Sequence, residues 1–153
     1  MKILSSCLLI LISISSLAAQ ENKAETEVKE TIQEFFQAFH EQDSIKLRAM
    51  VVPSIYMQSI AVDSSGNSEL ESEEYSKFLK SIVSIPSTTK FEERLLSFDI
   101  RMNGALASVI TPYSFYVNDI LSHCGVNSFQ LYKTEGEWKI IHIVDTRKKE
   151  GCK

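Results

Sequence analysis

The feature that most constrains the fold is the apolar segment at residues 123–152. It consists of two stretches of alternating apolar side chains joined by Glu135-Gly136, a pair that favours a tight turn. Two such stretches pair as an antiparallel hairpin, and because successive side chains point to opposite sides, one face of the hairpin is apolar. The chain is therefore predicted to contain an antiparallel sheet that buries one of its faces.

The N-terminal residues 1–18 are predicted to be a signal peptide. Lys2 provides a positive start, an apolar and serine-rich stretch follows, and Ser16-Leu17-Ala18 has the small residues of a cleavage site. The apolar stretch is too short to span a membrane, and an apolar first helix of the fold is the alternative. We expect the mature chain to be exported, to the periplasm or outside the cell, with no membrane span after cleavage.

Residues 19–153 have the length of a single domain. With 16 Lys and Arg against 20 Asp and Glu, the formal net charge is −4, and no basic cluster is present that would favour nucleic-acid binding. The sequence lacks a glycine-rich phosphate loop and the His and Cys spacing of metal sites. We therefore expect neither a cofactor, a metal nor a nucleic-acid partner.

Two cysteines, Cys124 and Cys152, remain in the predicted mature chain. An even number of cysteines in an oxidising compartment favours a disulfide, and two free thiols are the alternative. A bridge would close a loop of roughly 28 residues and add about 3 kcal/mol by restricting the unfolded chain.

The periodicity of apolar residues predicts helices followed by strands. Helical spacing is found at residues 25–40, after Asp43 as N-cap, and after Ser72 as N-cap. Alternation predicts strands at residues 55–62, 88–102, 105–117, 122–133 and 138–147. A polar loop is expected at residues 63–68, with turns at Asn103-Gly104, Asn118-Asp119 and Glu135-Gly136. Three N-terminal helices beside an antiparallel sheet predict an α+β fold.

The chain resembles the nuclear-transport-factor-2-like superfamily, in its SnoaL-like branch. The resemblance rests on Phe35-Phe36-x-x-Phe39 in the first helix and on Phe129-x-Leu131 with Gly136-x-Trp138-Lys139-Ile140 in the last hairpin. It implies a cone or half-barrel, in which a strongly bent antiparallel sheet wraps around the helices and leaves a pocket. Members include isomerases, dehydratases, epoxide hydrolases, binding proteins and dimerisation modules.

The inner face of the cone is predicted from the alternation in the last hairpin. A two-residue turn at Glu135-Gly136 pairs Phe129 with His142 and places both inside, together with Trp138. A bulged turn would exchange these partners. The predicted ligand-binding residues are Tyr113, Phe115, Phe129, Trp138 and His142, since aromatic rings with a few polar groups are typical of small-molecule pockets.

His142 is also the first candidate for an acid or base, and a core histidine bonded to a neighbour is the alternative. Asp145 is the second candidate, but it shares the opposite strand face with Arg147 and would act only if a bulge turned it inward. Asp99 is a further strand carboxylate expected to be exposed. His123 and Cys124 are adjacent on a strand and point apart, which argues against a Cys–His nucleophile.

The sequence thus predicts an exported domain that binds a small apolar or aromatic ligand in an aromatic-lined cone, without chemistry, as a homodimer through its sheet. One alternative is a SnoaL-like isomerase or hydrolase that uses His142 with a Tyr or Asp. The other is an interaction module whose exposed sheet face binds a partner.

Overall fold

A computed structural model describes residues 3–63 and 65–152, with side chains described from residue 22 onward. The side chains of the predicted signal peptide, residues 1–18, lie outside the described set, and that prediction stays a prediction. Within the described residues, no helix combines the length and the apolar character that crossing a membrane requires.

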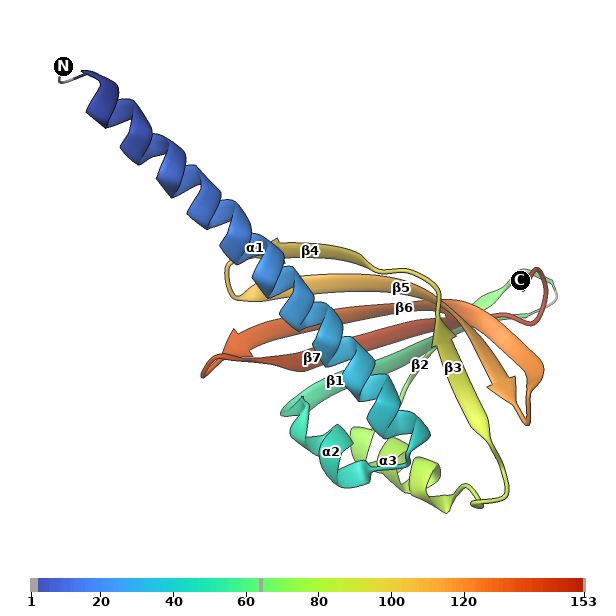
Figure 1. Ribbon diagram of the computed structural model, residues 1–153. Coiled ribbons are helices and arrows are strands. Elements are labelled where there is room, and N and C mark those ends of the chain that lie inside the picture. The colour runs from blue at the N-terminus through green and yellow to red at the C-terminus, as the bar shows by residue number, and fades with distance from the viewer. Residues whose placement is uncertain (1–2, 64, 153) are drawn as a thin grey trace.

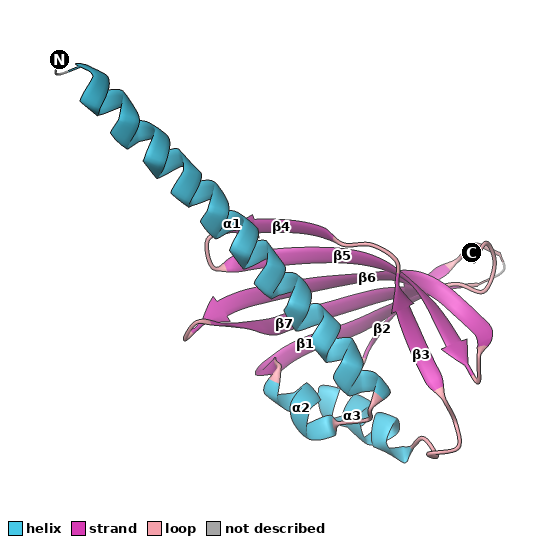
Figure 2. Cartoon of the chain, in the orientation of Figure 1, coloured by secondary structure: helices cyan, strands magenta, loops and turns pink. Residues whose placement is uncertain are grey.

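The described residues form three helices and a curved, unclosed sheet of seven strands. The helices are α1 (Ile3–His40), α2 (Ser44–Ala49) and α3 (Tyr75–Ser84). The strands are β1 (Val51–Val62), β2 (Ser68–Ser72), β3 (Phe91–Leu95), β4 (Asp99–Asn103), β5 (Leu106–Val117), β6 (Ile120–Thr134) and β7 (Glu137–Arg147). Helix α1 lies across the concave face of the sheet, and α2 and α3 pack beside its C-terminal end (Figures 1 and 2). The predicted α+β class is confirmed.

The strand order is β2-β1-β7-β6-β5-β3, with β4 also paired to β5. Five of the pairs among the described strands are antiparallel, but β1 and β7 are parallel, with Tyr56 opposite His142. The prediction of a wholly antiparallel sheet is wrong at this pair. The second strand of the last hairpin, β7, runs beside β1 in the same direction.

Two predicted segments differ in the structure. Residues 68–72, expected as loop and helix cap, form β2, which pairs with the end of β1. The predicted strand at residues 88–102 is broken into β3 and β4, and both pair with β5. Because of the break, β3 pairs with the C-terminal half of the strongly curved β5, and β4 pairs with its N-terminal half.

Several local signals are confirmed. The Asp43 carboxylate caps α2 by accepting hydrogen bonds from the backbone N–H groups of Ile45 and Lys46. Glu135 and Gly136 both have positive φ, as a tight hairpin turn of this type requires. The turn predicted at Asn103-Gly104 lies one residue later, because Asn103 still pairs with Leu106.

The core lies between α1 and the concave face of the sheet. The rings of Phe35 and Phe36 meet Phe129 edge to face, with centroids 6.0 and 5.9 Å apart. Each such pair contributes about 1 kcal/mol beyond the burial of apolar area. Gln42 joins the helices, since its side-chain amide donates to the carbonyl oxygens of Ile82 and Ile85 at 2.6 and 2.9 Å. The helices are therefore held at one end of the cone.

The C-terminal tail is fixed to the sheet. Cys124 and Cys152 form a disulfide with their Cα atoms 5.6 Å apart, as predicted. Between these cysteines in sequence, Lys148 exchanges two backbone hydrogen bonds with Cys124, at 2.9 and 3.0 Å. The chain immediately after β7 is therefore bound to β6 both covalently and by hydrogen bonds.

Candidate functional site

A bulge in β7 decides which side chains face the interior of the cone. Leu131 pairs with Ile140 and Gln130 pairs with His142, so Ile141 is an extra residue on β7. Beyond the bulge Phe129 pairs with Ile143, and the predicted pairing of Phe129 with His142 is wrong. As a result Asp145 points inward and is buried, while His142 points outward.

The interior of the cone contains a cavity of about 310 Å³. Phenylalanine side chains from α1, α3, β5 and β6 form much of its wall, and Met57, Ile82 and Ile143 complete the apolar part. The phenylalanines are Phe35, Phe36, Phe39, Phe78, Phe115 and Phe129. A concave, aromatic wall of this kind favours a flat, largely apolar molecule.

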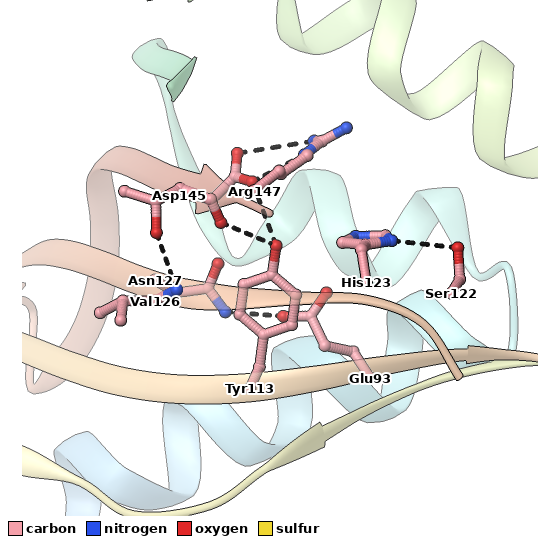
Figure 3. A network of polar contacts seen from close by, with 9 residues as sticks. Glu93, Tyr113, Ser122, His123, Val126, Asn127, Asp145 and Arg147 are labelled. Carbon is pink, nitrogen blue, oxygen red and sulfur yellow. Dashed lines mark hydrogen bonds and ion pairs between the residues drawn. The ribbon is translucent and has the colours of Figure 1, made fainter. Parts of the chain in front are cut away.

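The polar end of the cavity contains Glu93, Tyr113, His123, Asn127, Asp145 and Arg147, which come from β3, β5, β6 and β7 (Figure 3). Glu73, between β2 and α3, also lines the cavity. Arg147 Nε donates to Asp145 Oδ2 at 2.7 Å. The Asp145 side chain is 10% exposed and that of Arg147 is 53% exposed, so the ion pair lies where the cavity meets solvent. The carboxylate of Asp145 therefore has its counter-ion at the edge of the site.

Tyr113 links the polar end to the backbone of β7. Its hydroxyl lies 3.0 Å from the Thr146 carbonyl oxygen, to which it donates, and 3.4 Å from Asp145 Oδ2. Burial and the nearby Asp145 carboxylate raise the pKa of Tyr113 well above its ordinary value. Tyr113 is therefore a neutral hydrogen-bonding group at all physiological pH values.

Glu93 lies deeper, on β3, and has an amide as its partner. Asn127 Nδ2 donates to Glu93 Oε1 at 2.6 Å (Figure 3). Burial raises the pKa of Glu93 to about 7, against the lowering effect of the Asn127 hydrogen bond, and the Asp145 carboxylate adds to the increase. Near neutral pH this carboxyl group is therefore present in both its neutral and its ionised form.

Two histidines adjoin this end. His123 stacks on Phe115 with ring centroids 4.7 Å apart, and burial lowers its pKa. His40, on α1, accepts the backbone N–H of Glu93 at Nε2, 2.9 Å away, and burial lowers its pKa as well. Both rings are therefore favoured as neutral imidazoles.

Gly125 allows the polar end to assemble. A methyl group at this position would overlap the Thr146 carbonyl and would lie 3.0 Å from the Tyr113 ring. Because glycine has no side chain, β7 can bring its carbonyl over β6 to meet the Tyr113 hydroxyl.

Three of the predicted ligand-binding residues, Tyr113, Phe115 and Phe129, line the cavity. Trp138 is buried in the core but does not line it. His142 lies on the convex face, where its Nε2 is 3.1 Å from Gln58 Oε1 and its ring meets Tyr56 edge to face. The predicted faces of His142 and Asp145 are exchanged, because the bulge at Ile141 reverses the alternation in the second half of β7.

Glu93, His123 and Asn127 were missed as site residues. A signal for Glu93 was present, because it alternates with Phe91 and Leu95 on one strand face. Asn127 similarly alternates with Phe129 and Leu131. Among the residues with described side chains, no group of three His, Cys, Asp or Glu is placed to hold a metal ion.

The architecture matches solved nuclear-transport-factor-2-like structures. An NTF2-like protein of unknown function from Pseudomonas putida KT2440 is 17% identical, with 82% of this chain and 87% of that chain covered and a TM-score of 0.63. An NTF2-like protein from Cytophaga hutchinsonii is 14% identical, with 79% and 95% covered and a TM-score of 0.63. A "putative dehydratase from the NTF2-like family" of Streptomyces avermitilis is 15% identical, with 84% and 98% covered and a TM-score of 0.63. The fold is that of the nuclear-transport-factor-2-like superfamily, as the sequence motifs predicted.

Residues 23–144 match the model of the family described as "Putative lumazine-binding". The match covers most of the chain, and the chain belongs to this family. No curated protein matches it.

Proposed function

We propose that this protein is an exported binding domain whose cavity holds a small, planar heteroaromatic molecule of the lumazine type. The observation that carries the proposal is the cavity of about 310 Å³ with phenylalanine walls and hydrogen-bonding groups gathered at one end. Its volume is near the lower limit of ordinary ligand pockets, about 300–1,000 Å³, which suits a bicyclic ring system. The description of the family supports the same class of ligand.

The proposal is tested by titrating lumazine with the protein and following the fluorescence of the ring system. A saturable change with one site per chain is expected. Ile143→Phe, which fills the cavity, should weaken binding at least tenfold, whereas Val144→Phe, on the other face of β7, should not. Equal binding by both variants, with unchanged melting temperatures, would place the ligand elsewhere.

A second candidate function is acid–base catalysis in the same cavity. It is favoured by Glu93, whose pKa of about 7 lies near the operating pH of a general acid or base. Glu93 and Asp145 replace His142 in this role, because His142 lies on the convex face. Mass spectrometry of a bound ligand after long incubation separates the two functions. Unchanged ligand supports binding alone, and conversion that Glu93→Gln abolishes supports an enzyme.

We also propose that two copies associate through the convex face of the sheet. Large apolar side chains are exposed there, including Tyr56 at 71%, Ile110 at 47% and Tyr132 at 38%. Light scattering after size-exclusion chromatography should give the mass of a dimer, and Ile110→Lys should give that of a monomer. A monomeric wild-type protein would leave this face to a different partner, as in an interaction module.

A further inference from the structure

We propose that the cavity selects ligands with a lactam edge, an N–H group beside a C=O group, and that this edge pairs with the carboxylic acid of Glu93. The inference rests on the proposed function and specifies the chemistry of the same site. It is carried by the different environments of Glu93 and Asp145, which share the polar end of the cavity.

The first step concerns counter-ions. Asp145 is paired with Arg147 at 2.7 Å, whereas Glu93 forms no ion pair with any of the described side chains. The hydrogen-bond partner of Glu93 is the uncharged amide of Asn127. A buried carboxylate without a cation is unfavourable, so the neutral acid is the form that this environment stabilises.

The second step concerns the groups that face Glu93 from the neighbouring elements. They are His40 on α1, Tyr113 on β5, His123 on β6, and Asp145 with Arg147 on β7. Burial lowers the pKa of both histidines and raises that of the tyrosine, which favours their neutral forms, and the charges of Asp145 and Arg147 oppose each other. The carboxyl group of Glu73, between β2 and α3, also lines the cavity. The balance is consistent with the raised pKa of Glu93.

The third step concerns the two oxygens of Glu93. Oε1 accepts the hydrogen bond from Asn127, so the proton of the neutral acid resides on Oε2. A protonated Oε2 donates one hydrogen bond, and Oε1 keeps a second lone pair that can accept another. A lactam supplies the complementary C=O and N–H side by side, which gives two parallel hydrogen bonds in one plane. The phenylalanine walls hold a flat ring in that plane.

The experiment compares lumazine, which has free lactam N–H groups, with 1,3-dimethyllumazine, in which both are blocked. The wild-type protein should bind lumazine at least tenfold more tightly at pH 5.5. Between pH 5.5 and 8.5 its affinity for lumazine should fall roughly 30-fold, because a carboxyl group with a pKa of about 7 passes from almost wholly neutral to almost wholly ionised.

Glu93→Gln isolates the contribution of the carboxyl group, since the amide keeps N–H donors and a C=O acceptor at every pH. Ionisation of lumazine itself occurs in both titrations, so the difference in pH dependence between the two proteins is the contribution of the Glu93 carboxyl group. Glu92→Gln is the matched control, because Glu92 is the preceding residue and pairs with Arg94 outside the cavity. The affinity of Glu92→Gln for lumazine should equal that of the wild type at both pH values.

Two outcomes overturn the inference and leave the proposed function standing. One is equal affinity for lumazine and its dimethyl derivative, and the other is the same pH dependence in wild type and Glu93→Gln. If neither compound binds at either pH to protein with a normal melting transition, the proposed lumazine-type function fails, and the inference fails with it.

Discussion

Gly125 shows at the scale of a single residue how the cavity obtains its polar end. The absence of a side chain allows the Thr146 carbonyl to approach β6 and accept the Tyr113 hydroxyl. Asp145, which pairs with Asn127 across the same two strands, then lies with its Oδ2 3.4 Å from that hydroxyl. The position of the polar groups thus depends on one residue that has no polar group itself.

Gly125→Ala should lower the free energy of unfolding by about 2 kcal/mol or more, because the added methyl group forces the Thr146 carbonyl and the Tyr113 ring apart. Urea denaturation measures the change. Ser128→Ala, on the opposite face of the same strand, is the control and should have little effect. If Gly125→Ala had the same urea midpoint as the wild type, β7 would be shown to move away without a loss of stability.

The raised pKa of Glu93 predicts how stability depends on pH. The folded state holds a proton on Glu93 up to about pH 7, whereas the unfolded chain releases it near pH 4.5. Between these values the folded state binds more protons, so stability falls as pH rises, and the penalty is complete above pH 7. Glu93→Gln should therefore be more stable than the wild type at pH 8, by roughly 1–3 kcal/mol.

Melting temperatures of both proteins between pH 4 and 8 test this prediction. His40 and His123, whose lowered pKa values act in the opposite sense below pH 6.5, are present in both proteins and cancel in the comparison. If the melting temperatures of the two proteins changed in parallel with pH, the raised pKa of Glu93 would be contradicted. The expected result is a difference in melting temperature between the two proteins that grows from pH 4.5 to pH 7.

At the scale of the elements, much of the fold could be predicted, because helix stripes and hairpin turns are local signals. The strand β2 escaped prediction because Glu69, Leu70 and Glu71 carry no apolar alternation and all are exposed. The bulge at Ile141 escaped it because a bulge changes the pairing without changing the apolar character of Ile140, Ile141 and Ile143. One extra residue in β7 was enough to exchange the predicted positions of a histidine and an aspartate.

Two matched variants test the consequence of the bulge. His123→Ala should weaken lumazine binding about three- to tenfold, since the His123 ring lines the cavity and stacks on Phe115. His142→Ala should change it less than twofold, since that side chain bonds with Gln58 on the convex face. Fluorescence titration measures both. A larger loss of binding in His142→Ala than in His123→Ala would instead support the regular pairing, without a bulge, that the sequence predicted.

The disulfide is the second feature at this scale with a measurable effect. Replacing Cys124 and Cys152 together by serine should reduce the free energy of unfolding by about 3 kcal/mol, because the loop that they close spans 28 residues. Denaturation of the wild type with a reductant should reproduce the loss. Reductant should leave the double variant unchanged, and any shift of that variant would point to an effect other than the disulfide.

At the scale of the whole molecule, the sequence also predicts where the mature chain begins. When the full chain is expressed in a host that secretes it, N-terminal sequencing of the exported protein should start at Ala19. Replacing Ala18 by Arg removes the small residue that cleavage requires and should leave the apolar segment attached. Intact export with residues 1–18 retained would favour the alternative of an apolar first helix.

The central position of the last strand also affects when the protein can fold. Because β7 lies between β1 and β6, the strands on either side cannot join into one sheet until β7 (Glu137–Arg147) has been synthesised. Contacts between β1 and β7 connect residues more than 80 positions apart, such as Tyr56 and His142, and contacts of this range form slowly. Until β7 has been synthesised the growing chain therefore lacks its complete sheet, and a polypeptide in that state can still be threaded through a narrow channel.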